Sequence, residues 1–172
     1  TKGLDYWLDS VKYANLHSPH YIPSEFALSF VNFIRLVNDG QGEASPTPPF
    51  HLKMLDDLVD PNVEAQYIAN LCFRGASKTS LMVEYLALYL GVFGELPNLG
   101  SITGMIYVTD SMENGVKSAR KNIEFRYHSS EFLKRWITKV TFTDSYIEFT
   151  NKSNKKFGMR LYGAETGIRG GK

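Results

Sequence analysis

The sequence predicts an α/β fold with a parallel sheet flanked by helices, and three observations lead to this prediction. Between residues 66 and 127, two short apolar segments of strand type alternate with two longer segments of helical type. Strand, helix, strand, helix is the order typical of a parallel sheet with helical crossovers. A group of three strand-like segments follows, which predicts a β-meander near the C-terminal end. An all-helical segment precedes the alternation.

Composition places the 172-residue chain among globular domains. Its 43% apolar and 22% charged residues exclude a disordered polar chain. The longest apolar stretch, 81–93, contains Glu84 and is shorter than the about 20 residues that span a bilayer, so we expect no membrane contact. The start of the chain shows no export signal, and the single cysteine, Cys72, permits no internal disulfide, so a reducing compartment is expected. A net charge of +1 means that any contact with nucleic acid must be local or be made by parts of the protein outside this stretch.

Residues 1–45 are expected to form an N-terminal helical segment, and residues 46–172 the α/β core. Apolar spacing predicts a helix over 4–16 and a second one after Pro23, with Ser24 as its N-cap. The stretch 39–49 is too rich in glycine and proline to be regular, and Pro49 opens a short helix that continues to residue 59.

The core elements follow in order. A buried strand is expected over 66–73 and a helix over 78–92, then a second buried strand over 105–109 and a helix over 112–127. Asp110 and Glu113 have the spacing of a capping box for this last helix. The strands of the meander are expected over the ranges 139–143, 146–150 and 157–162.

The turn after the first strand has features of a phosphate-binding loop. Such a loop needs small residues whose N–H groups surround phosphates, a lysine for the outer phosphates and a following Ser or Thr for Mg²⁺. Lys78 and Thr79 meet the last two requirements at the start of a helix, whose dipole favours anions. The usual glycines are replaced by Cys72 and Ser77, and Gly75 is the one glycine of the loop. The alternative is a surface turn with a solvated lysine.

The segment Phe73-Arg74-Gly75-Ala76-Ser77-Lys78-Thr79 resembles the altered Walker A loop of large terminase subunits, the ATPases of tailed-phage DNA packaging, and is most similar to their T7-like branch. The resemblance implies a P-loop NTPase core with ATP and Mg²⁺ as cofactors. Lys78 would bind the β- and γ-phosphates, Thr79 would hold Mg²⁺, and Arg74 would contact the γ-phosphate unless it is a surface arginine at the sheet edge. The implied nucleotide-binding residues are Pro49, His51, Phe73, Arg74, Gly75, Ala76, Ser77, Lys78, Thr79 and Ser80.

Three further stretches are similar to the same family in the same order. Residues 47–55 are similar to the segment that receives the adenine, with His51 where the family commonly has a glutamine. Residues 105–111 and the basic helix after them resemble the second core strand and its DNA-side helix. Residues 163–170 resemble the segment before Walker B, in which Arg169 would act as a finger on a neighbouring subunit's ATP or, alternatively, is a salt-bridged loop arginine.

The resemblance, which covers 47–172, implies an ATP-hydrolysing motor that translocates double-stranded DNA into a procapsid. Lys78, Arg74 and Arg169 would be its catalytic residues, and copies of the chain would form a ring that meets the portal and the small terminase subunit in the cytoplasm of the infected host cell. Walker B and a nuclease domain are expected beyond Lys172, so this stretch alone is expected to be inactive. The alternatives are another P-loop translocase or helicase-like ATPase, or a non-enzymatic binding module.

Other polar residues are expected at DNA contacts, at solvated surfaces or in packing. Four basic residues of the helix over 112–127 would contact DNA phosphates or form a solvated face: Lys117, Arg120, Lys121 and Arg126. The charged tip of a hairpin is expected to contain Lys152, Lys155 and Lys156. Asp56 and Asp57 are expected at a solvated helix end, and Cys72 as a small packed residue. No metal site beyond Mg²⁺ is expected, because no metal-ligand spacing relates His17, His20, His128 and Cys72.

Overall fold

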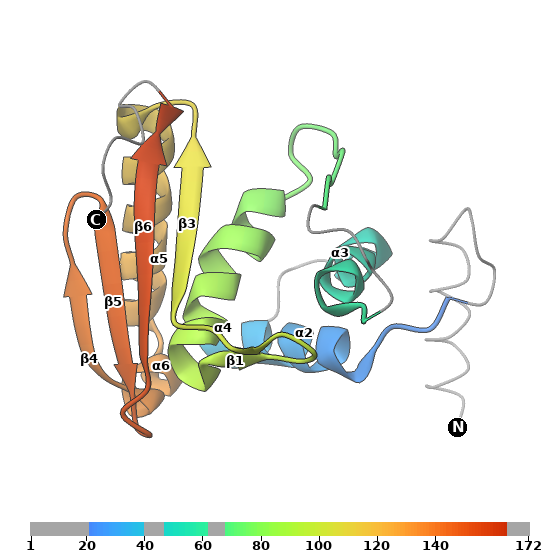
Figure 1. Ribbon diagram of the computed structural model, residues 1–172, viewed down its shortest axis with the longest axis horizontal. Helices are drawn as coiled ribbons and strands as arrows, with labels where there is room; N and C mark the ends of the chain where they lie inside the picture. The colour runs from blue at the N-terminus through green and yellow to red at the C-terminus, as the bar shows by residue number, and fades with distance from the viewer. Residues whose placement is uncertain (1–20, 40–46, 62–67, 165–172) are drawn as a thin grey trace.

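The computed structural model of the chain describes residues 21–39, 47–61 and 68–164. These residues form helices and a four-stranded sheet, which confirms the α/β class (Figure 1). The strands lie in the order β3-β6-β5-β4. Their bounds are Gly104–Thr109 for β3, Lys156–Gly163 for β6, Tyr146–Asn151 for β5 and Ile137–Phe142 for β4.

The sheet is mixed, so the prediction of a parallel sheet is only partly correct. β3 and β6 are parallel, whereas β6 pairs with β5 and β5 with β4 in antiparallel fashion. The predicted meander therefore supplies three of the four strands of this sheet. The parallel register runs from Gly104 opposite Gly158 to Thr109 opposite Gly163, which brings the carboxyl ends of β3 and β6 together.

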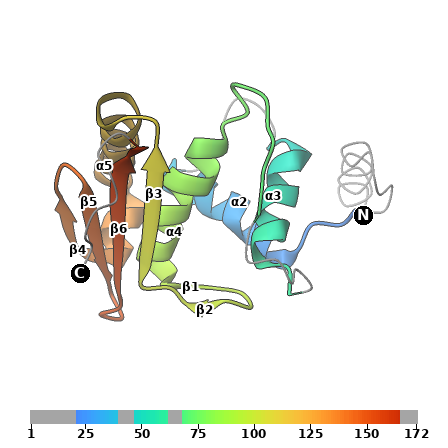
Figure 2. The ribbon, with the colours of Figure 1, turned by 45° about the horizontal axis from the view of Figure 1, so that its top comes forward.

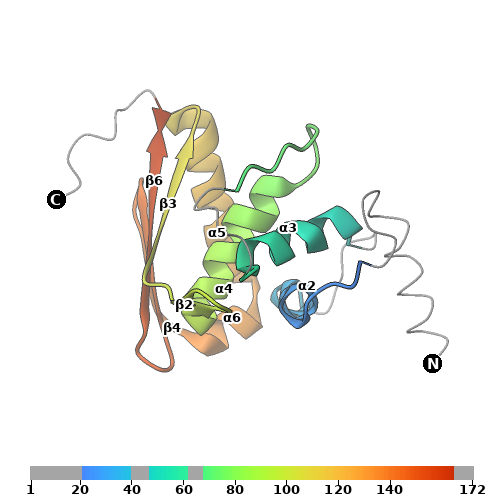
Figure 3. The same cartoon turned by 45° about the vertical axis from the view of Figure 1, so that its right-hand side comes forward.

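Helices α4 (Leu86–Phe93), α5 (Lys117–Ser129) and α6 (Glu131–Trp136) lie on one face of the sheet (Figure 3). Burial alternates along β5 and β6 because successive side chains of a strand point to opposite faces. Phe149, Met159 and Leu161 are fully buried on the helix side. Helix α4 approaches β5 closely at Gly91, where an added Cβ atom would lie 2.6 Å from Phe149 Cδ2.

Helices α2 (Glu25–Val37) and α3 (Pro49–Val59) lie beyond this layer and confirm the predicted helices. Ser24 caps α2 as predicted, since its hydroxyl accepts a hydrogen bond from the Ala27 amide. The phenylalanines of α2 pack on α4, with the rings of Phe30 and Tyr89 stacked at 5.1 Å. An aromatic cluster therefore joins α2 to α4.

Two segments of π-helix complete the architecture. One, η1 (Ser80–Tyr85), precedes α4, and the other, η2 (Met112–Val116), precedes α5, so both predicted helices contain a π segment near their start. A short hairpin of β1 (Glu95–Leu96) and β2 (Gly100–Ser101) follows α4 (Figure 2).

Two local predictions are wrong. Residues 68–73 are not a strand, and Leu71 and Phe73 are 98% and 68% exposed. An apolar segment forms a buried strand only where another strand pairs with it. No strand among the described residues pairs with residues 68–73. The cap of η2 is Ser111, which accepts from the Asn114 amide, whereas Asp110 accepts from the Ser111 amide. The predicted helix over 4–16 and most of the break over 39–49 lie outside the described residues.

Candidate phosphate-binding site

The predicted phosphate loop joins the irregular segment 68–73 to the helix that continues into α4 (Figure 2). Its backbone enters the left-handed region twice, with φ of 90° at Gly75 and 51° at Ser77. Between them lies Ala76, whose side chain is buried and whose amide donates to the Phe73 carbonyl oxygen at 3.3 Å. The helix then begins, because the Leu81 amide donates to the Ser77 carbonyl oxygen at 3.0 Å. The buried Ala76 side chain thus anchors an otherwise exposed loop.

Helix α3 holds this loop from the side, so the structure brings together the two segments expected to bind nucleotide. His51 is 7% exposed, and its Nε2 lies 2.7 Å from the Ala76 carbonyl oxygen. Because a carbonyl oxygen only accepts, His51 carries its proton on Nε2. The ring of Phe50 contacts that of Phe73 with centroids 5.9 Å apart. His51 therefore supports the loop backbone from the position where the family resemblance implies an adenine contact.

Lys78 and Thr79 lie in the first helical turn and are exposed. The first N–H groups of a helix have no partner within the helix, and the positive end of the helix dipole is located there. Left-handed residues beside right-handed ones turn successive N–H groups toward one side, as in anion-binding nests. With these features, the loop can bind an anion such as a phosphate.

Of the other predicted site residues, those that the structure describes lie in or beside the loop. Arg74 is exposed, and neither it nor Lys78 has a carboxylate partner among the described residues. Ser80 is the first residue of η1, and Pro49 is the first of α3. Cys72 is partly buried against the core as expected. Arg169 lies outside the described residues.

One polar residue behind the loop was not singled out as a site residue from sequence. Glu84 is 2% exposed and lies in η1, one turn after the loop. Its Oε1 accepts from Asn122 Nδ2 at 2.8 Å, and its Oε2 accepts from Arg126 Nε at 3.1 Å. A carboxylate inside the apolar stretch 81–93 is the sequence signal for such a buried partner. The network connects the helix after the loop to α5.

The predicted DNA-side residues of α5 are mostly paired with carboxylates. Arg126 binds buried Glu84, Arg120 pairs with Glu124, and Lys117, at the start of α5, pairs with Glu113. Only Lys121, which is exposed, has no carboxylate partner among the described residues. Arg126 is thus better described as a structural residue than as a free DNA contact.

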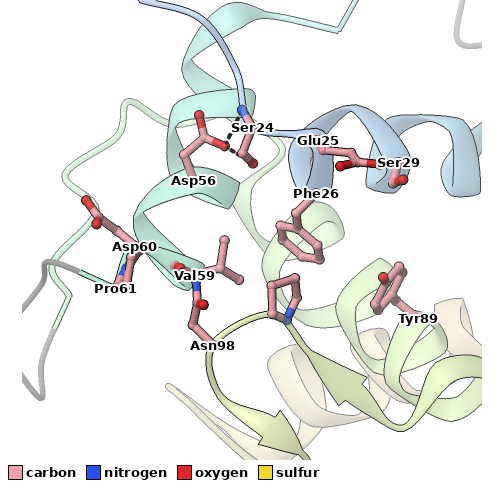
Figure 4. A pocket seen from close by; sticks show the side chains of 11 residues that line it. Ser24, Glu25, Phe26, Ser29, Asp56, Val59, Asp60, Pro61, Tyr89 and Asn98 are labelled. Atoms are coloured by element: carbon pink, nitrogen blue, oxygen red, sulfur yellow. Dashed lines mark hydrogen bonds between the residues drawn. The ribbon is translucent and has the colours of Figure 1, made fainter.

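A cleft among the described residues lies apart from the loop. It holds about 530 Å³ between α2, α3 and the β1–β2 turn, and Glu25, Asp56 and Asp60 contribute to its lining (Figure 4). Carboxylates repel phosphate groups, so this cleft does not suit a nucleotide.

Asp56 in this cleft corrects a prediction, because it is not simply solvated. It accepts from the amide and hydroxyl of Ser24 and from the hydroxyl of Tyr21, and so fixes the start of α2. The pKa of Tyr21 is raised far above its usual value, mainly by burial and secondly by the hydrogen bond to Asp56. Asp57 pairs with Lys53 on the surface of α3.

Within the described ranges, no three His, Cys, Asp or Glu side chains gather as a metal-binding group. No helix of the described part of the chain is long and apolar enough to cross a membrane. Comparisons with protein-family models, curated proteins and solved structures found no match.

Proposed function

We propose that the chain binds Mg·ATP at residues 73–80 and belongs to the ATP-hydrolysing motor of a DNA-packaging large terminase subunit. The observation that carries the proposal is the geometry of the loop. Left-handed Gly75 and Ser77 immediately precede a helix whose first turn presents Lys78 and Thr79. A phosphate at this position would meet backbone N–H groups, the helix dipole and an ammonium group together.

The roles of the individual residues follow from their positions. Lys78 would neutralise the β- and γ-phosphates, and the Thr79 hydroxyl would ligate Mg²⁺. Arg74 is exposed beside the loop and would reach the outer phosphate. His51 and Phe50 would hold the loop in its binding conformation, while Phe73, which is exposed and contacts Phe50, would lie against the nucleoside.

The motor function rests on the sequence resemblance. In this proposal Arg169 completes the site of a neighbouring copy in a ring, and hydrolysis drives double-stranded DNA into the procapsid in the host cytoplasm. The portal and the small terminase subunit would be its protein partners. Contacts with DNA phosphates would involve exposed Lys121 more than Arg126, which already binds Glu84.

A titration with Mg·ATP, followed by thermal unfolding, tests the binding step. Ligand at 100 times its Kd stabilises a protein by about 2.7 kcal/mol. We expect Lys78→Ala to abolish this stabilisation, whereas Lys139→Ala, which removes an exposed lysine of β4, retains it. Absence of stabilisation in the unmodified chain at millimolar Mg·ATP, or equal stabilisation of both variants, would contradict the proposed site and favour a non-enzymatic module.

A further inference from the structure

A separate pocket lies at the other end of the η1–α4 helix from the phosphate loop, next to α6. We call it the α6 pocket. It encloses about 320 Å³, which is within the range of small binding sites. Figures 1 and 3 both show α6 beside the C-terminal end of α4. Residues that line it include Leu36, Phe93, Trp136, Asn151, Lys152 and Lys155.

The α6 pocket gathers exposed apolar side chains from three helices. Leu36 of α2, Phe93 of α4 and Trp136 of α6 are 51%, 44% and 42% exposed. Single exposed apolar residues are normal on a protein surface, but a concave cluster of them indicates a binding surface. This cluster is available for burial against a partner.

The wall formed by the β5–β6 turn is held rigidly. Asn151 is 4% exposed, and its Nδ2 donates to the Val92 carbonyl oxygen at 2.8 Å. Its Oδ1 accepts from the amides of Ser153 and Lys155, each at 3.0 Å. The Lys152 amide donates to the Trp136 carbonyl oxygen at 3.0 Å, which ties the turn to α6. A wall fixed in this way loses little entropy when a ligand binds.

The charge of the α6 pocket is positive. Lys152 Nζ lies 5.0 Å from the centre of the Trp136 ring and has no carboxylate partner among the described residues. Lys155 pairs with Glu95 at 3.0 Å, but both side chains are about half exposed, and such a pair contributes little and can exchange. No acidic residue lines the pocket. A ligand with carboxylates would therefore complement its rim.

We propose that the α6 pocket docks a peptide segment of a partner protein, in which an apolar side chain is flanked by carboxylates. The apolar side chain would enter between Leu36, Phe93 and Trp136, and the carboxylates would meet Lys152 and Lys155. A single-stranded nucleic acid fits less well, because it needs a positively charged groove that tracks its backbone and aromatic faces for successive bases. Here one enclosed pocket has two lysines, and Lys152 already covers the Trp136 ring.

Fluorescence anisotropy with three labelled probe peptides tests the proposal on the whole chain. The first peptide places a Leu-Phe pair between glutamates, the second replaces the glutamates with lysines, and the third replaces Leu-Phe with Gly-Ser. We expect saturable binding of the first peptide only. Lys152→Glu is expected to weaken it by about tenfold or more, since reversing a contacting charge turns attraction into repulsion.

Two matched variants separate the pocket from general charge and folding effects. Leu36→Glu changes an exposed residue of the apolar wall and should also weaken binding of the first peptide. Lys156→Glu makes the same charge change as Lys152→Glu just outside the α6 pocket, and should leave the affinity for the first peptide within about twofold of its original value. Thermal unfolding of each variant checks that the fold is retained. The proposal is overturned if the first peptide does not saturate at millimolar concentration, if Lys152→Glu and Lys156→Glu bind it equally, or if an oligothymidine binds more tightly and competes.

Discussion

The carboxylate of Glu84 and the guanidinium of Arg126 form an ion pair that joins η1 to α5 behind the phosphate loop. Glu84 Oε2 lies 3.1 Å from Arg126 Nη2, and the side chains are 3% and 25% exposed. Arg126 Nη1 also donates to the Tyr85 hydroxyl, and the guanidinium lies 4.2 Å above the Tyr85 ring. Asn122 satisfies the other Glu84 oxygen. Both oxygens of this buried carboxylate therefore have donors.

Removal of Arg126 is expected to be strongly destabilising. In Arg126→Ala, Glu84 stays buried without its counter-charge, and breaking a buried pair in this way costs about 3–5 kcal/mol. Urea unfolding measures the loss. Lys117→Ala is the matched control, since its pair with Glu113 is exposed and contributes about 0.2–0.5 kcal/mol. Similar losses in the two variants would show that the pair with Glu84 is not essential to the fold.

Substitution of Gly75 tests the conformation of the loop. A Cβ at Gly75 would meet nothing within 4 Å, so the expected cost of Gly75→Ala, about 1–2 kcal/mol, comes from its φ of 90° alone. Gly100→Ala is a close control, because Gly100 has a φ of 71° and equally open surroundings but lies in β2, outside the loop. Both variants should lose stability in urea, but only Gly75→Ala should weaken Mg·ATP binding. Equal ATP affinity in the two would separate the loop conformation from nucleotide binding.

The hydrogen bond from His51 to the loop can be tested by an exchange of side chains. His51→Leu keeps the volume but leaves the Ala76 carbonyl without its donor, which is expected to cost about 1–3 kcal/mol. His51→Gln retains an N–H donor and should recover part of the stability and of the ATP affinity. Isothermal titration calorimetry measures the ATP affinity of each variant, and urea unfolding measures its stability. If glutamine behaved as leucine does, the donor would not be what matters at this position.

Alkaline pH should destabilise the fold through Tyr21. Burial and the hydrogen bond to Asp56 raise the pKa of Tyr21 above its ordinary value of 10.0, so the folded state holds the phenolic proton more tightly than the unfolded state does. The corresponding stability is fully present below pH 10 and is lost as the pH rises above it. Tyr21→Phe should be less stable at neutral pH and should show a shallower decline above pH 10. Unfolding curves across this range measure both effects, and a parallel decline in the two proteins would exclude Tyr21 as the cause.

Local signals in the sequence predicted the elements whose pattern is self-contained. The helix after Pro23 with Ser24 as its cap, and the strands expected over 146–150 and 157–162, all appear close to the predicted positions. The cap of η2 at Ser111 is a local failure, whereas the other failures concern relationships between distant segments. The apolar residues of 68–73 resemble those of a buried strand, but Leu71 lies in solvent because no described strand pairs with it. Strand order and the parallel pairing of β3 with β6 depend on long-range register, which local composition does not encode.

The candidate site was predicted in the same uneven way. Lys78 and Thr79 after a glycine-containing turn marked the loop as a candidate, and the structure places α3 against it through His51. The role of His51 as a support for Ala76, and the partner of Glu84, could not be inferred, because each joins residues more than twenty positions apart.

The parallel pairing of β3 with β6 has a consequence for synthesis of the chain. β3 leaves the ribosome well before β6, since η2, α5, α6, β4 and β5 lie between them in the sequence. Until β6 emerges, β3 is a nascent strand without its native neighbour, and it carries Ile106 and Val108, which remain exposed even in the finished sheet. Unpaired apolar strands of this kind promote aggregation during translation. Chains arrested between α6 and β6 should therefore bind chaperones more strongly than chains that extend past Gly163.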